Sequence, residues 1–384
     1  MEIRDVAPDD LDALFDLSGR AFGPLPPGER ARAVPPAREA IEAGRVLGCY
    51  DGGRLIGSGR YHPMEQWWSG TAVPMGGVAS VFVSPEERGR GVGARLARGL
   101  IELIAARGMP LSVLYPATAP VYRRVGYEHA GVQHWVTLPA EALRPLAVDP
   151  VEIRRAGPED AAQVVGVLAG VHRTARDSGP FERGVDHTRW VLSGPDVYAY
   201  LAEDGFLLYR WNGDGTGLVV ERAVAASERT ARALWSVVGS GSSTAKTVRA
   251  CISPHDPLLW QLRDRSAEDV HRRSWMLRIV DAPAAIATRG FPPHVTGGIT
   301  LAVDDELRPS NAGTWRLSVR DGRGTLTRTA GDPAAVRLPA RGLAALFAGV
   351  PVSTLRRCGL LAGGDDATVL TAAFATTPFA LDDF

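Results

Sequence analysis

The stretch that decides the fold is Val78-Ala-Ser-Val-Phe-Val-Ser-Pro-Glu-Glu-Arg-Gly-Arg-Gly-Val-Gly93. Its β-branched and aromatic residues predict a strand that ends at the turn Ser84-Pro85. Beyond the glycines, apolar residues recur at helical spacing over residues 94–106. A strand, a glycine-rich turn and a helix together predict an anion site, because the first N–H groups of a helix are unpaired and its dipole is positive there.

The turn itself, residues 88–93, carries the residue types that suit phosphate. Its glycines let an anion approach the main chain, and its two arginines can add charge-assisted hydrogen bonds. A nucleotide-triphosphate loop is excluded because Lys246 is the only lysine. The dinucleotide fingerprint is also excluded, because its G-x-G-x-x-G spacing is missing. A strand-to-helix connection without a ligand is the remaining alternative.

Composition bounds the class of protein. A chain of 384 residues predicts two or three domains, and 45% hydrophobic with 22% charged residues is typical of globular proteins. The net charge of zero argues against a nucleic-acid partner. Cys49, Cys251 and Cys358 lack metal-ligand spacing, so reduced thiols and no metal are expected. Without a leader or an apolar run of about 20 residues, we expect a cytoplasmic protein with no membrane partner.

The chain contains a repeat. Residues 2–10 (EIRDVAPDD) and 152–160 (EIRRAGPED) match at five of nine positions with an offset of 150, which indicates a duplicated domain. In the second copy, predicted strands at 206–211 and 216–224 precede Ser227-Glu-Arg-Thr-Ala-Arg232, which has no glycine. We therefore predict that the second copy has lost phosphate binding.

The remaining segments complete the predicted organisation. Proline-rich residues 23–36 predict an irregular segment, and residues 62–74, with Trp67, predict a loop. From about residue 290, three predicted antiparallel strands precede two predicted helices, at 299–303, 313–319, 324–329, 340–348 and 351–358. The expected domains are 1–140, 150–285 and 290–384.

Two motifs resemble the GNAT superfamily of N-acetyltransferases. Arg88-x-x-Gly91-x-Gly93 resembles its pyrophosphate signature, and Val121-Tyr-Arg-Arg-Val-Gly-Tyr127 resembles its terminal helix–strand signature. The order of the parts resembles Eis-type (enhanced intracellular survival) enzymes, and Trp275–Asp281 is similar to their hinge. The resemblance implies an α+β (mixed α/β) fold, with an active and a degenerate GNAT domain, each a central mixed sheet flanked by helices. A sterol-carrier-like α+β domain would follow.

The resemblance also implies acetyl-CoA as co-substrate. Its pyrophosphate would lie on the N–H groups of the glycine-rich turn, and its pantetheine amides would pair with the main chain of the preceding strand, like an added strand. The implied cofactor-binding residues are Val81, Phe82, Val83, Arg88, Gly89, Arg90, Gly91, Val92 and Gly93.

The resemblance assigns the catalytic roles as well. Tyr122 matches the general acid that protonates the leaving thiolate, and the terminal carboxylate of Phe384 corresponds to the general base. Asp383, Phe22 and Trp67 are predicted to contact the amine substrate. An acid that these enzymes often carry after the first helix is missing from residues 21–25, which argues against polycationic acceptors.

The predicted activity is transfer of an acetyl group to a primary amine of a small molecule, aminoglycoside-like or other, or to a lysine. One alternative is a non-catalytic CoA- or lipid-binding protein, and another is an acyltransferase that uses a different acyl donor in secondary metabolism. The resemblance further implies a homo-oligomer, a hexamer in the family.

Overall fold

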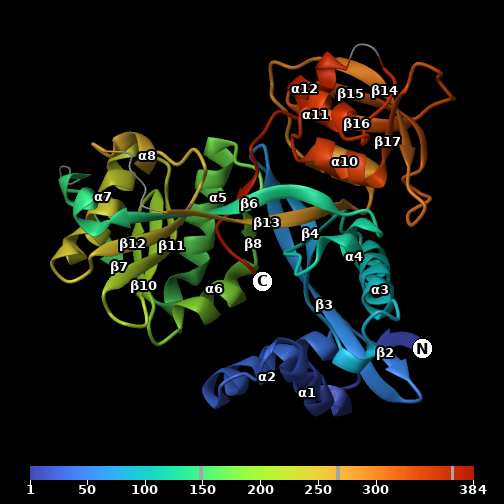
Figure 1. The fold of residues 1–384 in the computed structure, drawn as a ribbon. Coiled ribbons are helices and arrows are strands. Elements are labelled where there is room, and N and C mark those ends of the chain that lie inside the picture. Colours follow the sequence, from blue (N-terminus) through green and yellow to red (C-terminus); the bar gives the residue numbers. More distant parts are fainter. Residues whose placement is uncertain (147–149, 265–268, 365–366) are drawn as a thin grey trace.

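The computed structural model describes residues 1–146, 150–264, 269–364 and 367–384. Within them, a 14-stranded sheet runs through the first two thirds of the chain, and a separate four-stranded sheet forms the C-terminal part (Figure 1). No helix in these ranges is long and apolar enough to cross a membrane.

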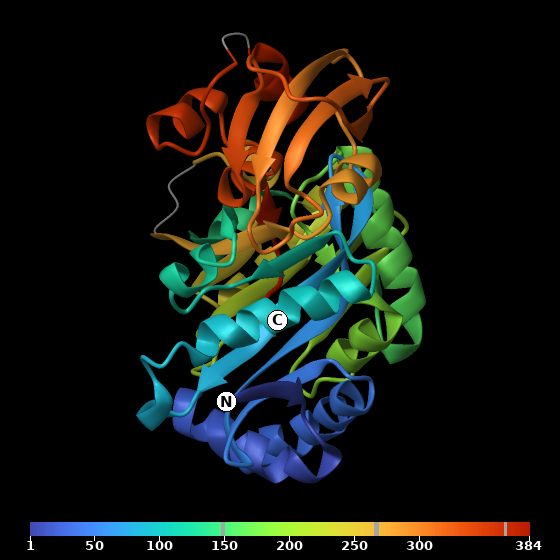
Figure 2. The same ribbon diagram turned by 90° about the vertical axis from the view of Figure 1, so that its right-hand side faces the viewer.

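The first part of the large sheet is built by five strands, with β2, β3 and β4 forming an antiparallel meander and β5 running parallel to β4. The strands are β1 (Glu2–Asp5), β2 (Val46–Asp51), β3 (Arg54–Trp68), β4 (Thr71–Val83) and β5 (Leu111–Leu114). Helix α3 (Val92–Ala106) lies along one face of the sheet (Figure 2), and its apolar side chains pack there. Helix α1 (Leu11–Phe22) packs on the other face through Leu17.

The segment 23–36, predicted to be irregular, is mostly helical. Helix α2 spans Pro27–Glu42. Pro27 lies in its first turn, where the missing N–H costs nothing because that group has no partner in a helix. Pro35 and Pro36 lie inside the helix. One side of the helix is nevertheless buried against the first part of the large sheet. The density of prolines, read as a loop signal, was therefore misleading here.

The loop predicted at 62–74 is also wrong, because these residues extend β3 and β4 into a long hairpin. The turn consists of Ser69 and Gly70, with φ of 49° and 80°. Two consecutive left-handed residues are what a tight two-residue hairpin turn requires. Trp68, just before the turn, is fully buried, which explains why the strand continues so far.

The second part of the sheet repeats the first and confirms the duplication. Strand β11 runs parallel to β12 after an antiparallel β9–β10–β11 meander, as β4 runs parallel to β5. The elements are β7 (Arg154–Arg155), α5 (Ala161–Ala175), β8 (Phe181–Glu182), α6 (Gly184–Leu192), β9 (Tyr198–Ala202), β10 (Gly205–Trp211), β11 (Gly217–Ala225), α7 (Glu228–Ser240), β12 (Thr247–Ile252) and α8 (Leu258–Gln261).

The two halves exchange their last strands. Strand β6 (Glu128–Pro139), from the first half, pairs with β12, whereas β13 (Asp269–Ile279), from the second, pairs with β5. The two exchanged strands also pair with each other, so the sheet is continuous. Most of Trp275–Asp281, expected to be a hinge, therefore lies in a buried strand. We keep the domain boundaries at 140, 150, 285 and 290 as a proposal.

The C-terminal part confirms the predicted strands and helices and adds a parallel edge strand, β17. Its elements are α9 (Ala282–Thr288), β14 (Gly297–Asp304), β15 (Gly313–Arg320), β16 (Arg323–Arg328), β17 (Val336–Pro339), α10 (Ala340–Phe347), α11 (Val352–Arg357) and α12 (Thr368–Ala373). A buried ion pair of 2.6 Å between Arg278 and Asp305 joins it to β13.

The chain then returns to the large sheet. Strand β18 (Phe379–Ala380) pairs in parallel with Val132–Gln133 of β6, and the C-terminus ends between the two halves (Figure 1). Thus one end of the C-terminal part is positioned by the strand that the first half donates to the second.

Candidate active site

The glycine-rich turn has a backbone shape that only glycine adopts cheaply. Gly89 and Gly91 have φ of 82° and 79°, and Gly91 caps α3. A Cβ atom at either position would meet open space, so the conformation and not crowding requires glycine. Gly93, by contrast, lies within α3, and a Cβ atom there would be 3.8 Å from Val121 Cγ1.

The turn also presents unpaired donors. In the described chain, the backbone N–H groups of residues 89–94 have no hydrogen-bond acceptor, and the first helical bond runs from Arg95 N to Gly91 O at 3.1 Å. Consecutive free N–H groups at a helix start form a concave anion site. The residues present therefore fit a pyrophosphate group.

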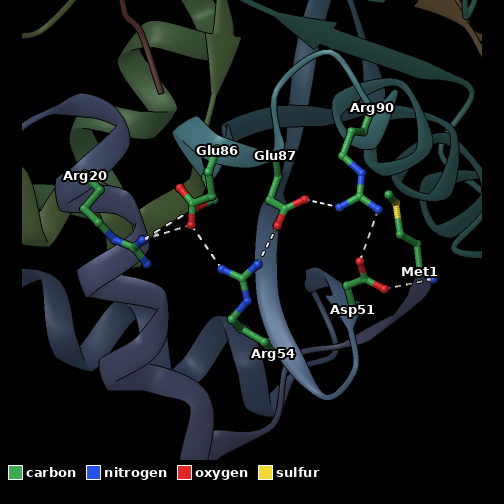
Figure 3. A network of polar contacts seen from close by, with 8 residues as sticks. Met1, Arg20, Asp51, Arg54, Glu86, Glu87 and Arg90 are labelled. Carbon is green, nitrogen blue, oxygen red and sulfur yellow. Dashed lines mark hydrogen bonds and ion pairs between the residues drawn. The ribbon is translucent and has the colours of Figure 1, made fainter.

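The two arginines of the turn differ in their partners. The Arg90 guanidinium donates to Glu87 and, at 3.3 Å, to Asp51, while Glu87 also accepts from Arg54 (Figure 3). Arg88 is exposed and has no side-chain partner among the described residues. Arg88 is thus free to meet an anion, whereas Arg90 ties the turn to the β2–β3 hairpin.

Strands β4 and β5 separate next to this turn. Their parallel pairing covers Met75–Val78 and Leu111–Leu114, and β4 continues to Val83 without a β5 partner. A bulge marks the separation, where Ser80 has φ of 51°. The gap leaves one main-chain edge of residues 79–83 open to an extended ligand.

Side chains on this open segment belong to the core. Val81 and Val83 pack on the face of the sheet that α3 covers, and Val92, at the start of α3, is buried there too. Only the main chains of these three residues are therefore available to a ligand. Phe82 faces the other side, where the ring of Phe22 meets it edge-on at 5.9 Å. Phe22 is 62% exposed, so its ring covers Phe82 from the solvent side.

Tyr122 lies in the short helix α4 (Ala119–Arg123) that follows β5. It is buried, which raises its pKa to about 12, and its hydroxyl has no hydrogen-bond partner in the described residues. The neighbouring Tyr127 shares a 2.6 Å hydrogen bond with Ser112 Oγ. Of the two tyrosines, only Tyr122 has a phenol free to donate.

The C-terminal Phe384 reaches the same part of the sheet. Its ring packs edge-on against Phe181, Tyr115 and His62, with centroids 5.2, 5.8 and 6.5 Å away. A methyl group placed on Gly77 would lie 2.9 Å from this ring. Gly77 is the residue before Val78, the last β4 residue paired with β5, so the tail ends beside the strand separation.

Polar contacts fix the tail just before its end. The Tyr115 hydroxyl donates to the Asp382 carbonyl at 2.7 Å, and the Asp382 carboxylate accepts from Arg222. Asp383 Oδ2 lies 2.5 Å from Arg273 Nη1. Two apolar side chains of the tail, Phe379 and Leu381, are both buried and anchor it.

A cavity of about 350 Å³ lies between the tail and the second half. Its walls combine aromatic and charged side chains, among them Phe181, Glu182, Arg183, Trp190, Asp382 and Asp383. Asp383 therefore lines a cavity, although its carboxylate is already held by an arginine.

Trp67 lies elsewhere. It is buried in β3, where its ring is 6.0 Å from that of His172 and 5.7 Å from the Arg173 guanidinium, both on α5. It does not line the cavity. Trp67 thus packs the first half on the second, and we leave it out of the proposed site.

Three residues of this region escaped the sequence analysis: Arg60, His62 and Arg183. Arg60 and His62 alternate along β3, and Arg183 follows β8, which pairs with β3. Burial and the nearby arginine charges lower the pKa of His62 to about 2. The alternation of polar and apolar residues along a long strand was the available signal. Predicting a loop at 62–74 led us to overlook it.

Comparison with known proteins agrees with this architecture. Models of the acetyltransferase (GNAT) domain match residues 2–130 and 174–279, and a sterol carrier protein domain model matches 282–380. An uncharacterised N-acetyltransferase from Streptomyces coelicolor is 26% identical, over 94% of this chain and 92% of that protein.

Solved structures are similar over the whole chain. Eis1 from Mycobacterium abscessus has a TM-score of 0.79 at 24% identity, covering 100% of both chains, which shows a shared fold. A GCN5-related N-acetyltransferase from Kribbella flavida has a TM-score of 0.97 at 42% identity and covers 100% of this chain and 98% of its own. With two GNAT domains, a sterol-carrier domain and this degree of identity, the chain belongs to the GCN5-related N-acetyltransferases.

Proposed function

We propose that this acetyltransferase uses acetyl-CoA to acetylate a primary amine of a small molecule or a lysine, with Tyr122 as general acid and the terminal carboxylate of Phe384 as general base. The observation that carries the proposal is the position of the tail. The ring of Phe384 lies against β4 at Gly77, beside the separation of β4 and β5. A chain end so firmly packed is unusual, because termini are commonly mobile.

The cofactor would be held by main chain and one arginine. The free N–H groups of residues 89–94 and the unpaired Arg88 suit the pyrophosphate, and the open edge of residues 79–83 suits the pantetheine amides. When bound, acetyl-CoA supplies an activated acetyl group as a thioester.

Tyr122 would supply the proton that the leaving sulfur requires. Its raised pKa, caused by burial, keeps the phenol protonated at any working pH, so it can donate but cannot act as a base. The N–C bond forms as the C–S bond breaks, and the phenolic proton goes to the sulfur. Positioning matters more than driving force here, since a phenol of pKa about 12 is a weak acid.

The Phe384 carboxylate would take the proton that the amine loses. A terminal carboxylate ordinarily has a pKa of about 3.5 and is a weak base. The Phe384 ring packs on the rings of Phe181 and Tyr115, and a carboxylate becomes a stronger base where such apolar neighbours exclude water from it. The same packing fixes its place on the sheet.

The test measures thiol release from acetyl-CoA with a panel of primary amines. We expect Tyr122→Phe to lower kcat by about 100-fold, the usual contribution of a general acid. Deleting Phe384, or adding two glycines after it, should lower kcat at least as much. Tyr198→Phe, on β9 in the second half, is the matched control and should change kcat less than twofold.

Each outcome addresses one role. A Tyr122→Phe enzyme with unchanged kcat and pH profile refutes the general acid. A glycine-extended enzyme with unchanged kcat refutes the terminal base. A chain that neither binds CoA nor releases thiol with any amine refutes the whole proposal. The expected homo-oligomer belongs to this proposal too, and light scattering on the purified chain measures it.

A further inference from the structure

Several cationic side chains lie near His62 of β3. Arg60 lies two residues before it on the same face, and Arg183 and Arg45 are close enough for their charges to disfavour protonation of His62. Arg45 is compensated because it pairs with Glu39. The other two arginines define what we call the Arg60–Arg183 pair.

Neither guanidinium of this pair has a hydrogen-bond or ion-pair partner within residues 1–146, 150–264, 269–364 and 367–384. The Arg60 Nε atom is buried without an acceptor, as is His62 Nε2. Arg183 borders the cavity beside the tail, where the charges of Asp382, Asp383 and Glu182 act on it through space. Buried cations and donors without partners are costly, so such groups in a native structure need an explanation.

The acids nearby do not supply it. Asp382 is held by Arg222, and Asp383 by Arg273. Glu182 accepts the backbone N–H groups of Arg183 and Gly184, at 2.9 and 3.2 Å. The charges of these three side chains favour the charged form of Arg183, but among the described residues none of the three accepts a hydrogen bond from either guanidinium of the Arg60–Arg183 pair.

The charges around the two arginines differ. Burial lowers the pKa of Arg60 to about 10, with further contributions from the charges of Arg183 and Arg45. Burial also lowers the pKa of Arg183, against the opposite effect of Asp382, Asp383 and Glu182. Arg60 has no such acid beside it, so an anion that reached both guanidinium groups would offset the cationic surroundings of Arg60 and accept its free donors.

The location ties this anion site to the reaction. The charges of both arginines act on His62, and the His62 ring lies 6.5 Å from that of Phe384. The exposed Trp190 of α6, whose ring lies under the Arg32 guanidinium at 5.0 Å, lies at the cavity wall and joins α6 to α2. A small molecule could thus place one end on the arginines and the other beside the tail.

We propose that the acceptor is a small amine that also carries an anionic group, a carboxylate, phosphate or sulfate, and that Arg60 and Arg183 bind this group while the amine reaches Phe384. This rests on the function proposed above. It agrees with the absence of an acid from residues 21–25, which argues against polycationic acceptors.

Matched acceptors test the proposal directly. We compare β-alanine with β-alaninamide and phosphoethanolamine with ethanolamine in the thiol-release assay. The anionic member of at least one pair should have the higher kcat/KM, by about 10- to 100-fold, as expected for charge-assisted hydrogen bonds. Turnover of the neutral members alone overturns the anionic-acceptor proposal and leaves the acetyltransferase proposal standing.

Variants locate the effect. Arg60→Gln and Arg183→Gln should each lower kcat/KM for the anionic member by about tenfold or more, and leave the neutral member within twofold. Arg98→Gln is the control, because Arg98 is exposed on α3 and has no partner in the described chain. Equal losses for both members in Arg60→Gln and Arg183→Gln overturn the proposal, since they indicate a general structural role. Arg183→Gln keeps the test valid should Arg60→Gln not fold.

A binding measurement serves if no amine is turned over. The protein is first saturated with CoA to fill the glycine-rich turn, and sodium sulfate is then titrated by calorimetry at constant ionic strength. Saturable binding that Arg183→Gln abolishes supports the proposal, and its absence in the parent protein overturns it. Sulfate binding that appears only after Phe384 is deleted also overturns it, because the arginines then serve the terminal carboxylate.

Discussion

The two halves of the large sheet share a topology but differ in whether equivalent polar groups have hydrogen-bond partners. At the start of α3, the N–H groups of residues 89–94 are free. At the start of α7, the equivalent helix, Ser227 Oγ accepts from Thr230 N at 3.3 Å, and Thr230 Oγ1 is bonded to Asp204. The second half thus caps with its own side chains the place where the first half would bind an anion.

The same contrast appears along the middle strand of each meander, β3 in the first half, and β10 with the residue after it in the second. Arg210 of β10 lies 150 residues after Arg60 of β3, the offset of the N-terminal repeat, and donates to Glu221 at 2.6 Å. Asn212, at the same offset from His62, accepts the Gly217 N–H at 2.9 Å. In the second half these positions are satisfied, whereas Arg60 Nε and His62 Nε2 are not.

The difference shows where chemistry can take place on a duplicated fold. Binding energy for a ligand comes from groups that the protein leaves unpaired, and leaving them so costs stability. In the second half the corresponding helix start is capped by side chains, and this half contributes walls of the cavity.

The largest expected effect concerns the turn before α3. If both Gly89 and Gly91 are replaced by Ala, two alanines must adopt the left-handed conformation, which costs roughly 1–3 kcal/mol each. We expect the turn to change shape and the Kd for CoA to rise by about 100-fold, as measured by calorimetry. Gly93→Ala is the control, because its helical backbone accepts a Cβ atom, with Val121 Cγ1 at 3.8 Å.

Equal CoA affinity in the double variant and the parent would break the comparison, because the turn would then not be the phosphate site. A loss of affinity in Gly93→Ala alone would move the anion contact into the first turn of α3. Circular dichroism separates either result from misfolding.

His62 predicts a pH effect on stability. Its folded pKa of about 2 lies below the ordinary 6.5, so the unfolded chain binds the proton more tightly and stability falls as pH drops below 6.5. At pH 5 this loss amounts to at most about 2 kcal/mol. His62→Gln should flatten the decline in urea-unfolding free energy between pH 7 and 5.

His187 stacks on Trp190 and has a pKa lowered to about 3, mainly by burial, so His187→Gln should flatten the decline too. His294→Gln, at an exposed position of the C-terminal part, is the control and should leave the slope unchanged. A His62→Gln variant with the parent slope would show that His62 charges readily and that the cationic surroundings do not matter.

Local sequence was enough to predict the turn before α3, because glycine conformation and helix capping depend on neighbouring residues. The match between residues 2–10 and 152–160 was enough to predict the duplication, while the role of Tyr122 stays a prediction. Local sequence could not predict the exchange of β6 and β13, since pairing between strands some 140 residues apart leaves no local trace. The Arg60–Arg183 pair escaped for the same reason, because β3 and β8 meet only in the folded chain.

Arg88 and Arg90 offer a finer comparison within the turn. Arg88→Gln should raise the Kd for CoA by about tenfold, since it removes a free guanidinium from the anion site. Arg90→Gln should change it less than threefold, because Arg90 already pairs with Glu87 and Asp51. Calorimetry at two salt concentrations checks both. The reverse order would mean that CoA binding breaks the ion pairs of Figure 3.

Ser227→Ala tests the other side of the comparison and should have the smallest effect. Losing an N-cap costs about 1 kcal/mol of stability, and the freed N–H groups of α7 would then resemble those of α3. We nevertheless expect no second CoA site, because residues 228–232 keep side chains where residues 89 and 91 have glycine. Urea unfolding measures the loss, and calorimetry measures the stoichiometry of CoA. Two CoA molecules per chain in Ser227→Ala would show that capping alone closes the second half, and that glycine is not what distinguishes the two.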